Sequence, residues 1–207
     1  MRKLAKPNHD TAGMLHSFAG GTQNKEQRLY EASKANDLPK AKQLLALRAD
    51  PNGHRERGSS CLHVSCQHKL SSKDIVAVLL NAGADPVAED GDGWQALHWA
   101  ASVNAEDPIR LLLERHADPN ARTQRGETPL HWAAKNDSAR AVRALASHPQ
   151  VDLLARTSRD HETALEWARS FQSAAAEGVL KGAVTAAGAA GAAHVAATEA
   201  RGPPWVI

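Results

Sequence analysis

The chain has 207 residues, 42% of them hydrophobic, which is enough for one ordinary domain or one short repeat array. Its 25 Lys and Arg residues nearly balance 23 Asp and Glu residues, and a formal charge of +2 argues against a nucleic-acid-binding protein, which usually has a concentrated basic face. Two cysteines, Cys61 and Cys66, are too few for a disulfide framework and favour a reducing compartment.

The predicted organisation begins with a polar leader, residues 1–25, which we expect to be flexible. It contains Pro7 and Gly20-Gly21 and lacks the apolar run of a secretory signal. Repeated units follow over residues 26–172. The first two span 28–58 and 59–93, the third and fourth start at Gly93 and Gly126, and a fifth starts at residue 162.

Anchor leucines set the register of these units. Leu62, Leu97, Leu130 and Leu165 follow one another at steps of 35, 33 and 35 residues. The extra residues fall in turns, where insertions leave helix packing intact. A period near this length is typical of a solenoid of helix pairs, in which each unit buries its apolar face only against its neighbours. The functional region is then expected to be a long surface rather than a catalytic pocket.

Each unit carries its own helix signals. Thr128-Pro129 places a capping hydroxyl before a proline at the first helical position. Leu130, Ala133 and Ala134 then fall at i, i+3 and i+4, which is one apolar face of a helix. The same capping position is held by Ser60 and Thr163.

These strings resemble a known repeat family. "TPLHWAA" at Thr128 to Ala134 resembles the ankyrin repeat signature, as do "GADP" at Gly83 to Pro86 and "ADPNA" at Ala117 to Ala121. The resemblance covers residues 26–172 and implies an all-α ankyrin-repeat solenoid of stacked helix–turn–helix units with hairpin-like tips. The first unit lacks the capping Thr and the His, and the fifth has Glu166 where His is expected, which is typical of the degenerate caps of an array.

The tail, residues 173–207, is rich in Ala and Gly. Ala favours a helix, and several Gly residues interrupt it. We expect one helix that caps the last repeat, disorder from about Arg201, and no membrane span. The last three residues, Trp205-Val206-Ile207, resemble a ligand of PDZ domains, although three residues are weak grounds.

Histidine and cysteine residues raise the question of a metal or catalytic site. His63, His98 and His131 recur in phase, which is compatible with a metal or acid–base ladder. The ankyrin resemblance implies instead that each ring bonds backbone and neighbouring-unit groups. Cys61, His63, Cys66 and His68 also form a dense cluster, but Cys61 and Cys66 would point about 140° apart on one helix, so they do not converge on zinc.

The sequence therefore predicts no metal site and no cofactor. It also has no phosphate-binding loop after a strand and no nucleophile–base–acid set at a known spacing. An enzyme is not expected.

The aromatic pattern is more informative about function. Trp99, Trp132 and Trp167 hold one position in consecutive units, and Trp94 lies at a hairpin tip beside them. This position lies off the buried Leu/Ala face and shares a side with Lys135, which in an ankyrin-like stack faces the concave groove. Trp is the residue most enriched in binding hot spots. Two interpretations remain compatible: the rings contact a partner, or they complete the packing between repeats.

Charged and polar residues at the turn tips are further candidates for partner contact, as the family resemblance implies. They form a polar rim around an apolar centre, as protein interfaces do. These tip residues are Glu89, Asp92, Arg122, Gln124, Arg125 and Glu127.

The favoured function is a protein–protein interaction module that presents a preformed groove to one or more partner proteins. The alternative is a regulatory inhibitor or assembly chaperone that masks a surface of an enzyme or complex, including a secreted bacterial effector. We expect no nucleic-acid or membrane partner, a monomer in isolation, and a cytoplasmic or nuclear location.

Overall fold

The structure is a computed structural model, and it describes residues 25–53, 55–68 and 72–199, with side chains through residue 188. Helices account for the regular structure of these residues, which contain no strand and only two isolated bridges. The predicted all-α repeat solenoid is confirmed. Most of the predicted leader and the C-terminal Trp205-Val206-Ile207 lie outside the described residues.

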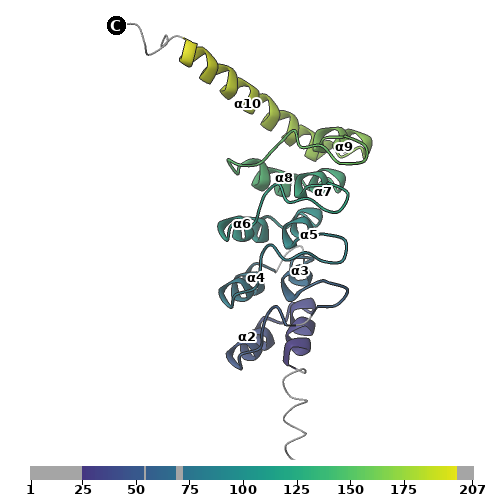
Figure 1. Cartoon of the computed structure of the whole chain (residues 1–207), viewed down its shortest axis with the longest axis vertical. Coiled ribbons are helices and arrows are strands. Elements are labelled where there is room, and N and C mark those ends of the chain that lie inside the picture. Colours follow the sequence, from purple (N-terminus) through teal and green to yellow (C-terminus); the bar gives the residue numbers. More distant parts are fainter. Residues whose placement is uncertain (1–24, 54, 69–71, 200–207) are drawn as a thin grey trace, which may run out of the picture.

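The helices stack as pairs in two columns (Figure 1). In each pair the first helix lies in the column beside the hairpin loops, and the second lies in the other column. The pairs are residues 25–34 with α2 (Leu38–Ala46), α3 (Cys61–Ser65) with α4 (Ser72–Asn81), α5 (Ala96–Ser102) with α6 (Glu106–Glu114), α7 (Pro129–Lys135) with α8 (Ala139–Ala146), and α9 (Ala164–Ser170) with α10 (Ala174–Glu199).

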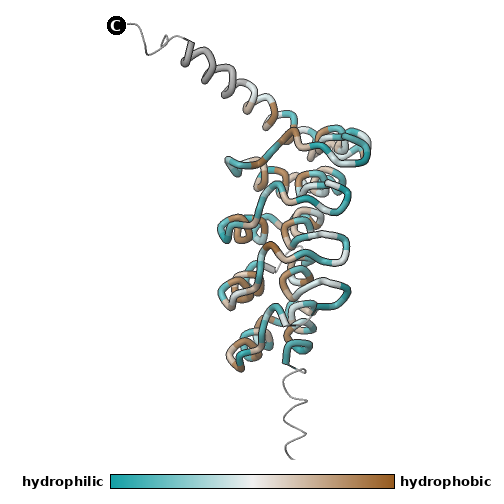
Figure 2. Tube along the Cα trace, viewed as in Figure 1, coloured by the Kyte–Doolittle hydropathy of each residue, from teal (hydrophilic) through white to brown (hydrophobic). Residues whose placement is uncertain are grey.

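A continuous apolar interior runs between the two columns (Figure 2). In α7 it takes Leu130, Ala133 and Ala134, all buried, as the periodicity predicts. The small alanines let α7 lie close to α5 and α9. Cys66 follows α3 at the position equivalent to Ala134 and is fully buried. Truncating a buried leucine of this interior would cost about 2–5 kcal/mol.

Helix starts follow the local signals in the sequence. Thr128 is the N-cap of α7 and Pro129 is its first residue. Thr163 caps α9, where its hydroxyl accepts a hydrogen bond from the backbone N–H of Glu166 (3.3 Å). The Glu166 carboxylate in turn accepts the backbone N–H of Thr163 (2.7 Å), which lowers the pKa of Glu166. A glutamate can therefore replace histidine in the last unit, because both side chains offer an acceptor to the N-cap.

Backbone hydrogen bonds tie each hairpin tip to the next. The N–H of Gln124 donates to the carbonyl of Asp92 (3.3 Å), and the N–H of Ser158 donates to that of Arg125 (3.0 Å). Gly126 has φ +75°, and a Cβ there would lie 2.7 Å from the Ser158 nitrogen. Glycine is required at this position because the next tip approaches so closely.

The N-terminal part of α10 packs against α8 and α9, and the helix then extends away from the stack (Figure 1). Ala176 and Leu180 are fully buried against the array. The Asp137 carboxylate accepts the backbone N–H of Ala176 (2.8 Å), which caps α10 from the preceding unit. None of the described helices is both long and apolar enough to span a membrane. The boundary at 172/173 remains a prediction of where the array ends.

Candidate functional site

A ladder of buried histidines joins successive units. The backbone N–H of Ser60 donates to Nδ1 of His63 (3.1 Å), and that of Thr128 donates to Nδ1 of His131 (3.1 Å). Because Nδ1 accepts, Nε2 must carry the proton, and it donates to a carbonyl of the next tip: Trp94 for His63 (2.9 Å) and Glu162 for His131 (3.0 Å). The predicted structural role of these histidines is confirmed.

His98 occupies the middle of the ladder and is 0% exposed. Its Nδ1 accepts the N–H of Gln95 (3.1 Å), and its Nε2 lies 3.1 Å from the carbonyl oxygen of Ala121 and 3.2 Å from that of Glu127. Burial lowers the pKa of His98 from 6.5 to about 4, and burial lowers the pKa of the other two rings as well. The rings are therefore neutral linkers between units at pH 7.

The cysteines and histidines of residues 61–68 take part in packing and in hydrogen bonds within the fold. Burial raises the pKa of Cys61 to about 11 and that of Cys66 to about 12, so both remain thiols at neutral pH. His63 uses both ring nitrogens within the ladder, and Nε2 of His68 contacts the carbonyl oxygen of Lys34 (2.9 Å). Over the described residues, no three potential ligands group around a common point.

Indole rings gather on the first-helix side of the third and fourth units. The ring centroid of Trp94 lies 5.5 Å from that of Trp99 and 4.2 Å from that of Trp132. All three rings are partly exposed, and we call them the tryptophan cluster. Trp167 continues the row with an edge contact to Trp132 at 6.0 Å. The sequence prediction that Trp94 lies beside the stripe is confirmed.

Trp94 is an exception within the repeat. Asp90 and Thr123 are equivalent positions, 33 residues apart. The side-chain oxygen of each accepts hydrogen bonds from two backbone N–H groups of its own tip, two and four residues further along the chain. The last residue of the tip is Trp94 in the third unit and Glu127 in the fourth. The third unit therefore has an additional indole, which lies between its own recurring ring, Trp99, and that of the next unit, Trp132.

The indole N–H groups differ in their partners. Nε1 of Trp99 donates to the Asp90 carboxylate (3.1 Å). At the equivalent place Thr123 has a shorter side chain, and its hydroxyl donates to the Glu127 carboxylate (3.1 Å) instead. Nε1 of Trp132 is consequently buried without an acceptor within the described part of the chain.

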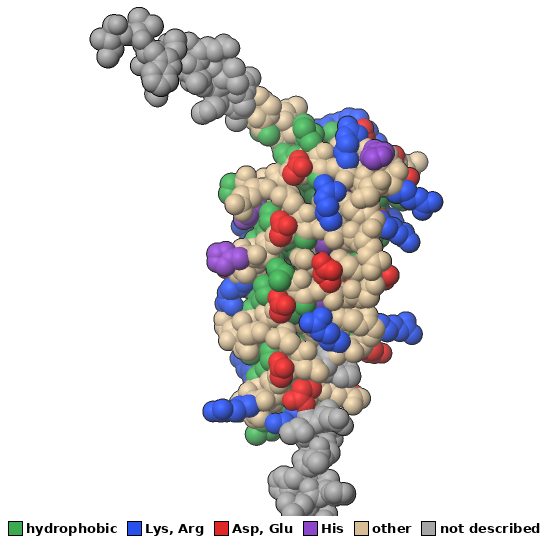
Figure 3. All heavy atoms as spheres, viewed as in Figure 1, with side chains coloured by type: hydrophobic (Ala, Val, Ile, Leu, Met, Phe, Trp, Pro, Cys, Tyr) green, Lys and Arg blue, Asp and Glu red, His purple; other side chains and the backbone are tan. Residues whose placement is uncertain are grey.

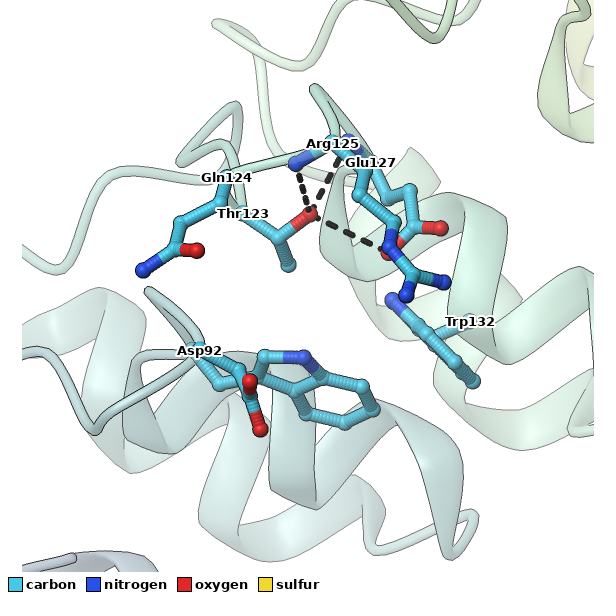
Figure 4. A pocket seen from close by; sticks show the side chains of 7 residues that line it. Asp92, Thr123, Gln124, Arg125, Glu127 and Trp132 are labelled. Carbon is cyan, nitrogen blue, oxygen red and sulfur yellow. Dashed lines mark hydrogen bonds between the residues drawn. The ribbon is translucent and has the colours of Figure 1, made fainter. Parts of the chain in front are cut away.

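Two hollows adjoin the tryptophan cluster. The first, about 270 Å³, lies between the second and third tips, where Arg125 extends toward Trp132 while Gln124 diverges from it (Figure 4). The second, about 290 Å³, is lined by the three indoles with Asp90, Asp92, Ser102 and Asn136. Asp92, Trp94 and Trp132 border both hollows, so the cluster separates them.

The predicted tip residues differ in exposure, and five of the six are exposed. Glu89, Asp92, Arg122, Gln124 and Arg125 are exposed at the tips. Lys and Arg side chains gather along the tip edge of the stack (Figure 3). Arg122 and Gln124 also tie neighbouring tips: the Arg122 guanidinium donates to the carbonyl of Arg156 (2.8 Å), and the Gln124 amide donates to that of Gly91 (3.0 Å).

Two of the predicted contact residues, Glu127 and Trp167, are much less exposed than expected. Glu127 is only 8% exposed, because its carboxylate accepts the Thr123 hydroxyl within the tip. Trp167 is only 7% exposed, because its ring packs against those of His131 (centroids 5.3 Å apart), Trp132 (6.0 Å) and Phe171 (5.8 Å). Both side chains are therefore largely buried in this structure, although Glu127 still borders the first hollow.

Lys135, also predicted, is partly exposed with its ammonium over the rings of the last two units. Its Nζ lies 4.5 Å from the ring centroid of Trp132, 5.1 Å from that of Phe171 and 5.8 Å from that of Trp167. These separations are within the range of cation–π attraction. The sequence placed Lys135 on this side but gave no sign of Phe171 as a third ring.

Sequence reasoning missed Asp90 and Ser102 in the second hollow, whereas the spacing of Asn136 from Trp132 predicts its place on this side. Asp90 lies in a turn, and its step of 33 to Thr123 marks it as a tip-closing position. Ser102 lies three residues after Trp99, as Lys135 does after Trp132. That spacing puts Ser102 on the same helix side as the rings, which is the signal that could have found it.

Comparison with known proteins agrees with the geometry. A family model described as ankyrin repeats (3 copies) matches residues 29–123 and 109–185. The chain belongs to the ankyrin repeat family.

This ankyrin repeat protein also resembles a segment of one curated human protein, the mitochondrial disaggregase, with 36% identity over 73 residues. The segment is 35% of this chain and 10% of the human protein, so the chain spans about a tenth of that relative's length. Ankyrin repeats are typically non-enzymatic modules for protein–protein interaction, and that general role is the one the family supports.

Proposed function

We propose that this ankyrin array binds a partner protein through the tryptophan cluster and the second and third hairpin tips. The observation that carries the proposal is the insertion of Trp94 between Trp99 and Trp132, which leaves three indoles partly exposed around two hollows. Indoles with a polar rim form the usual centre of a protein interface.

Rigidity supports the same surface. The tips are tied to each other by backbone bonds and to the helices by the histidine ladder. A surface held in this way loses little conformational entropy when a partner binds. Exposed Asp92 and Arg125, which lie on neighbouring tips beside the first hollow, supply charges of both signs that would orient the partner.

The test is affinity capture with the tagged chain, followed by quantification of each captured protein. Trp94→Ala combined with Trp99→Ala should reduce capture at least tenfold. Both rings are partly exposed and Trp99 also packs against the apolar interior, so the array should lose some stability but remain folded at the temperature of the capture experiment. Leu154→Ala is the matched control, since Leu154 is 64% exposed and lies away from the cluster. Undiminished capture by the double variant with a folded array would contradict the proposal.

The alternative role, an inhibitor or assembly chaperone that masks a surface, uses the same site. The identity of the captured protein and its activity with and without the bound array decide between the two roles. The relative's printed name, a disaggregase, describes a protein of which this chain resembles one small segment.

A further inference from the structure

The last two units show how this scaffold holds an ammonium group. Lys135 leaves the end of α7, and its Nζ lies within 6 Å of the ring centroids of Trp132, Trp167 and Phe171. The site beside two successive Trp rings is thus filled by a lysine of the chain itself. We call it the closed niche.

One unit earlier the same position holds a short side chain. Ser102 precedes Lys135 by 33 residues, as Trp99 precedes Trp132. The space that a lysine would fill is the hollow of about 290 Å³ lined by Trp94, Trp99 and Trp132. We call it the open niche.

The charge of the open niche is complementary to a cation. Its remaining lining residues are Asp90, Asp92, Ser102 and Asn136, and among the described residues no Lys, Arg or His borders it. Asp92 is exposed and belongs to none of the ion pairs within the described part of the chain. The indole faces add negative potential from their π systems. By contrast, the first hollow already contains Arg125.

We propose that the open niche binds the ammonium group of a lysine side chain from the partner protein, in the way that the closed niche holds Lys135. This inference rests on the proposed function and specifies the partner's chemistry. The partner lysine would lie against Trp99 and Trp132 with Asp92 at its ammonium.

The geometry favours an ammonium over a guanidinium. The ring of Trp94 is tilted by 55° to Trp99 and by 47° to Trp132, so the three rings form a concave wall rather than a flat slot for stacking. Asp90 is already engaged, because its carboxylate accepts two backbone N–H groups and Nε1 of Trp99. Asp90 therefore offers no free pair of oxygens for the bidentate contact that arginine prefers, which leaves only Asp92 among the carboxylates of the lining for such a contact.

The probe is Nα-acetyl-lysine N-methylamide, titrated into the ¹⁵N-labelled full chain while the indole N–H signals are followed by NMR. The norleucine and arginine analogues serve as the neutral and guanidinium comparisons. We expect saturable shifts of the Trp99 and Trp94 signals with the lysine probe, and at least threefold weaker binding of both comparison probes. Equal binding of norleucine or arginine would overturn the assignment of an ammonium site.

Two variants test the location. Ser102→Lys should fill the open niche from within and abolish the shifts, whereas Ser170→Lys, at the equivalent exposed position of the last unit, should leave them unchanged. Asp92→Asn should weaken binding severalfold, and Glu89→Gln, which changes the charge of the same tip equally, should not. Retained shifts in folded Ser102→Lys would refute the niche as the site.

Partner capture separates this inference from the proposed function. If capture depends on the tryptophan cluster but Ser102→Lys captures the partner as well as wild type, the interaction surface stands and the lysine site is wrong. If capture does not depend on the cluster, the proposed function is wrong, whatever the probe does.

Discussion

Acid should weaken the histidine ladder, and the effect can be isolated at His98. The pKa of His98 is about 4 in the folded chain against 6.5 for an exposed histidine, because burial disfavours the charged ring. The unfolded chain therefore binds more protons between these values, and the free energy of unfolding falls as the pH drops through 6.5 toward 4. Above pH 6.5 this contribution is fully present.

The magnitude follows from the two pKa values. From pH 7.5 to pH 5, His98 alone should lower the free energy of unfolding by about 2 kcal/mol, a factor of roughly 30 in the unfolding constant. The lowered pKa values of His63 and His131 add further loss in the same direction. Protonation of Nδ1 would also remove the acceptor for the Gln95 N–H, which is how a charge there breaks the helix cap.

The assay is urea denaturation followed by circular dichroism at both pH values, for wild type and His98→Gln. The variant should be less stable at pH 7.5, because it loses part of the bonding to the next tip, and the gap should shrink by about 2 kcal/mol at pH 5. His116→Gln, at an exposed histidine, is the control for loss of a titrating side chain. A gap between wild type and His98→Gln that is constant with pH would refute the reasoning.

Three substitutions test the packing between units by thermal or urea denaturation. Val87→Asn should stabilise the chain by about 1 kcal/mol. At the equivalent positions Asn52 and Asn120 each form hydrogen bonds with the loop of the next unit through the side-chain amide. An unchanged melting temperature would count against a stabilising role of these amide bonds. Gln95→Thr should also raise stability by about 1 kcal/mol, since it removes a buried amide oxygen that has no partner among the described residues and gives α5 the type of cap residue that α7 and α9 have. A loss of stability would contradict this. Trp167→Ala should cost about 3–5 kcal/mol, and a cost under 1 kcal/mol would mean that the ring is not part of the interior.

Much of the fold follows from short-range patterns in the sequence. The step from Leu97 to Leu130 sets the repeat, and Thr128-Pro129 starts a helix at the residue where α7 begins. The bonding of His131 was also predictable, because its Nδ1 partner lies three residues away in the same helix cap. Such features are local or periodic, so each unit specifies them with its own residues.

The sequence by itself therefore determined the helix pairs, their stacking order and the side of the stack that carries the indoles. Only the tertiary structure decided which of those side chains remain accessible. Glu127 folds back onto its own tip, and Trp167 packs between the rings of Trp132 and Phe171. The Lys135 side chain reaches the rings of the next unit and fills its niche, whereas Ser102 is too short and leaves its niche open. The repeat period of the sequence carries no information about how far a side chain extends between units.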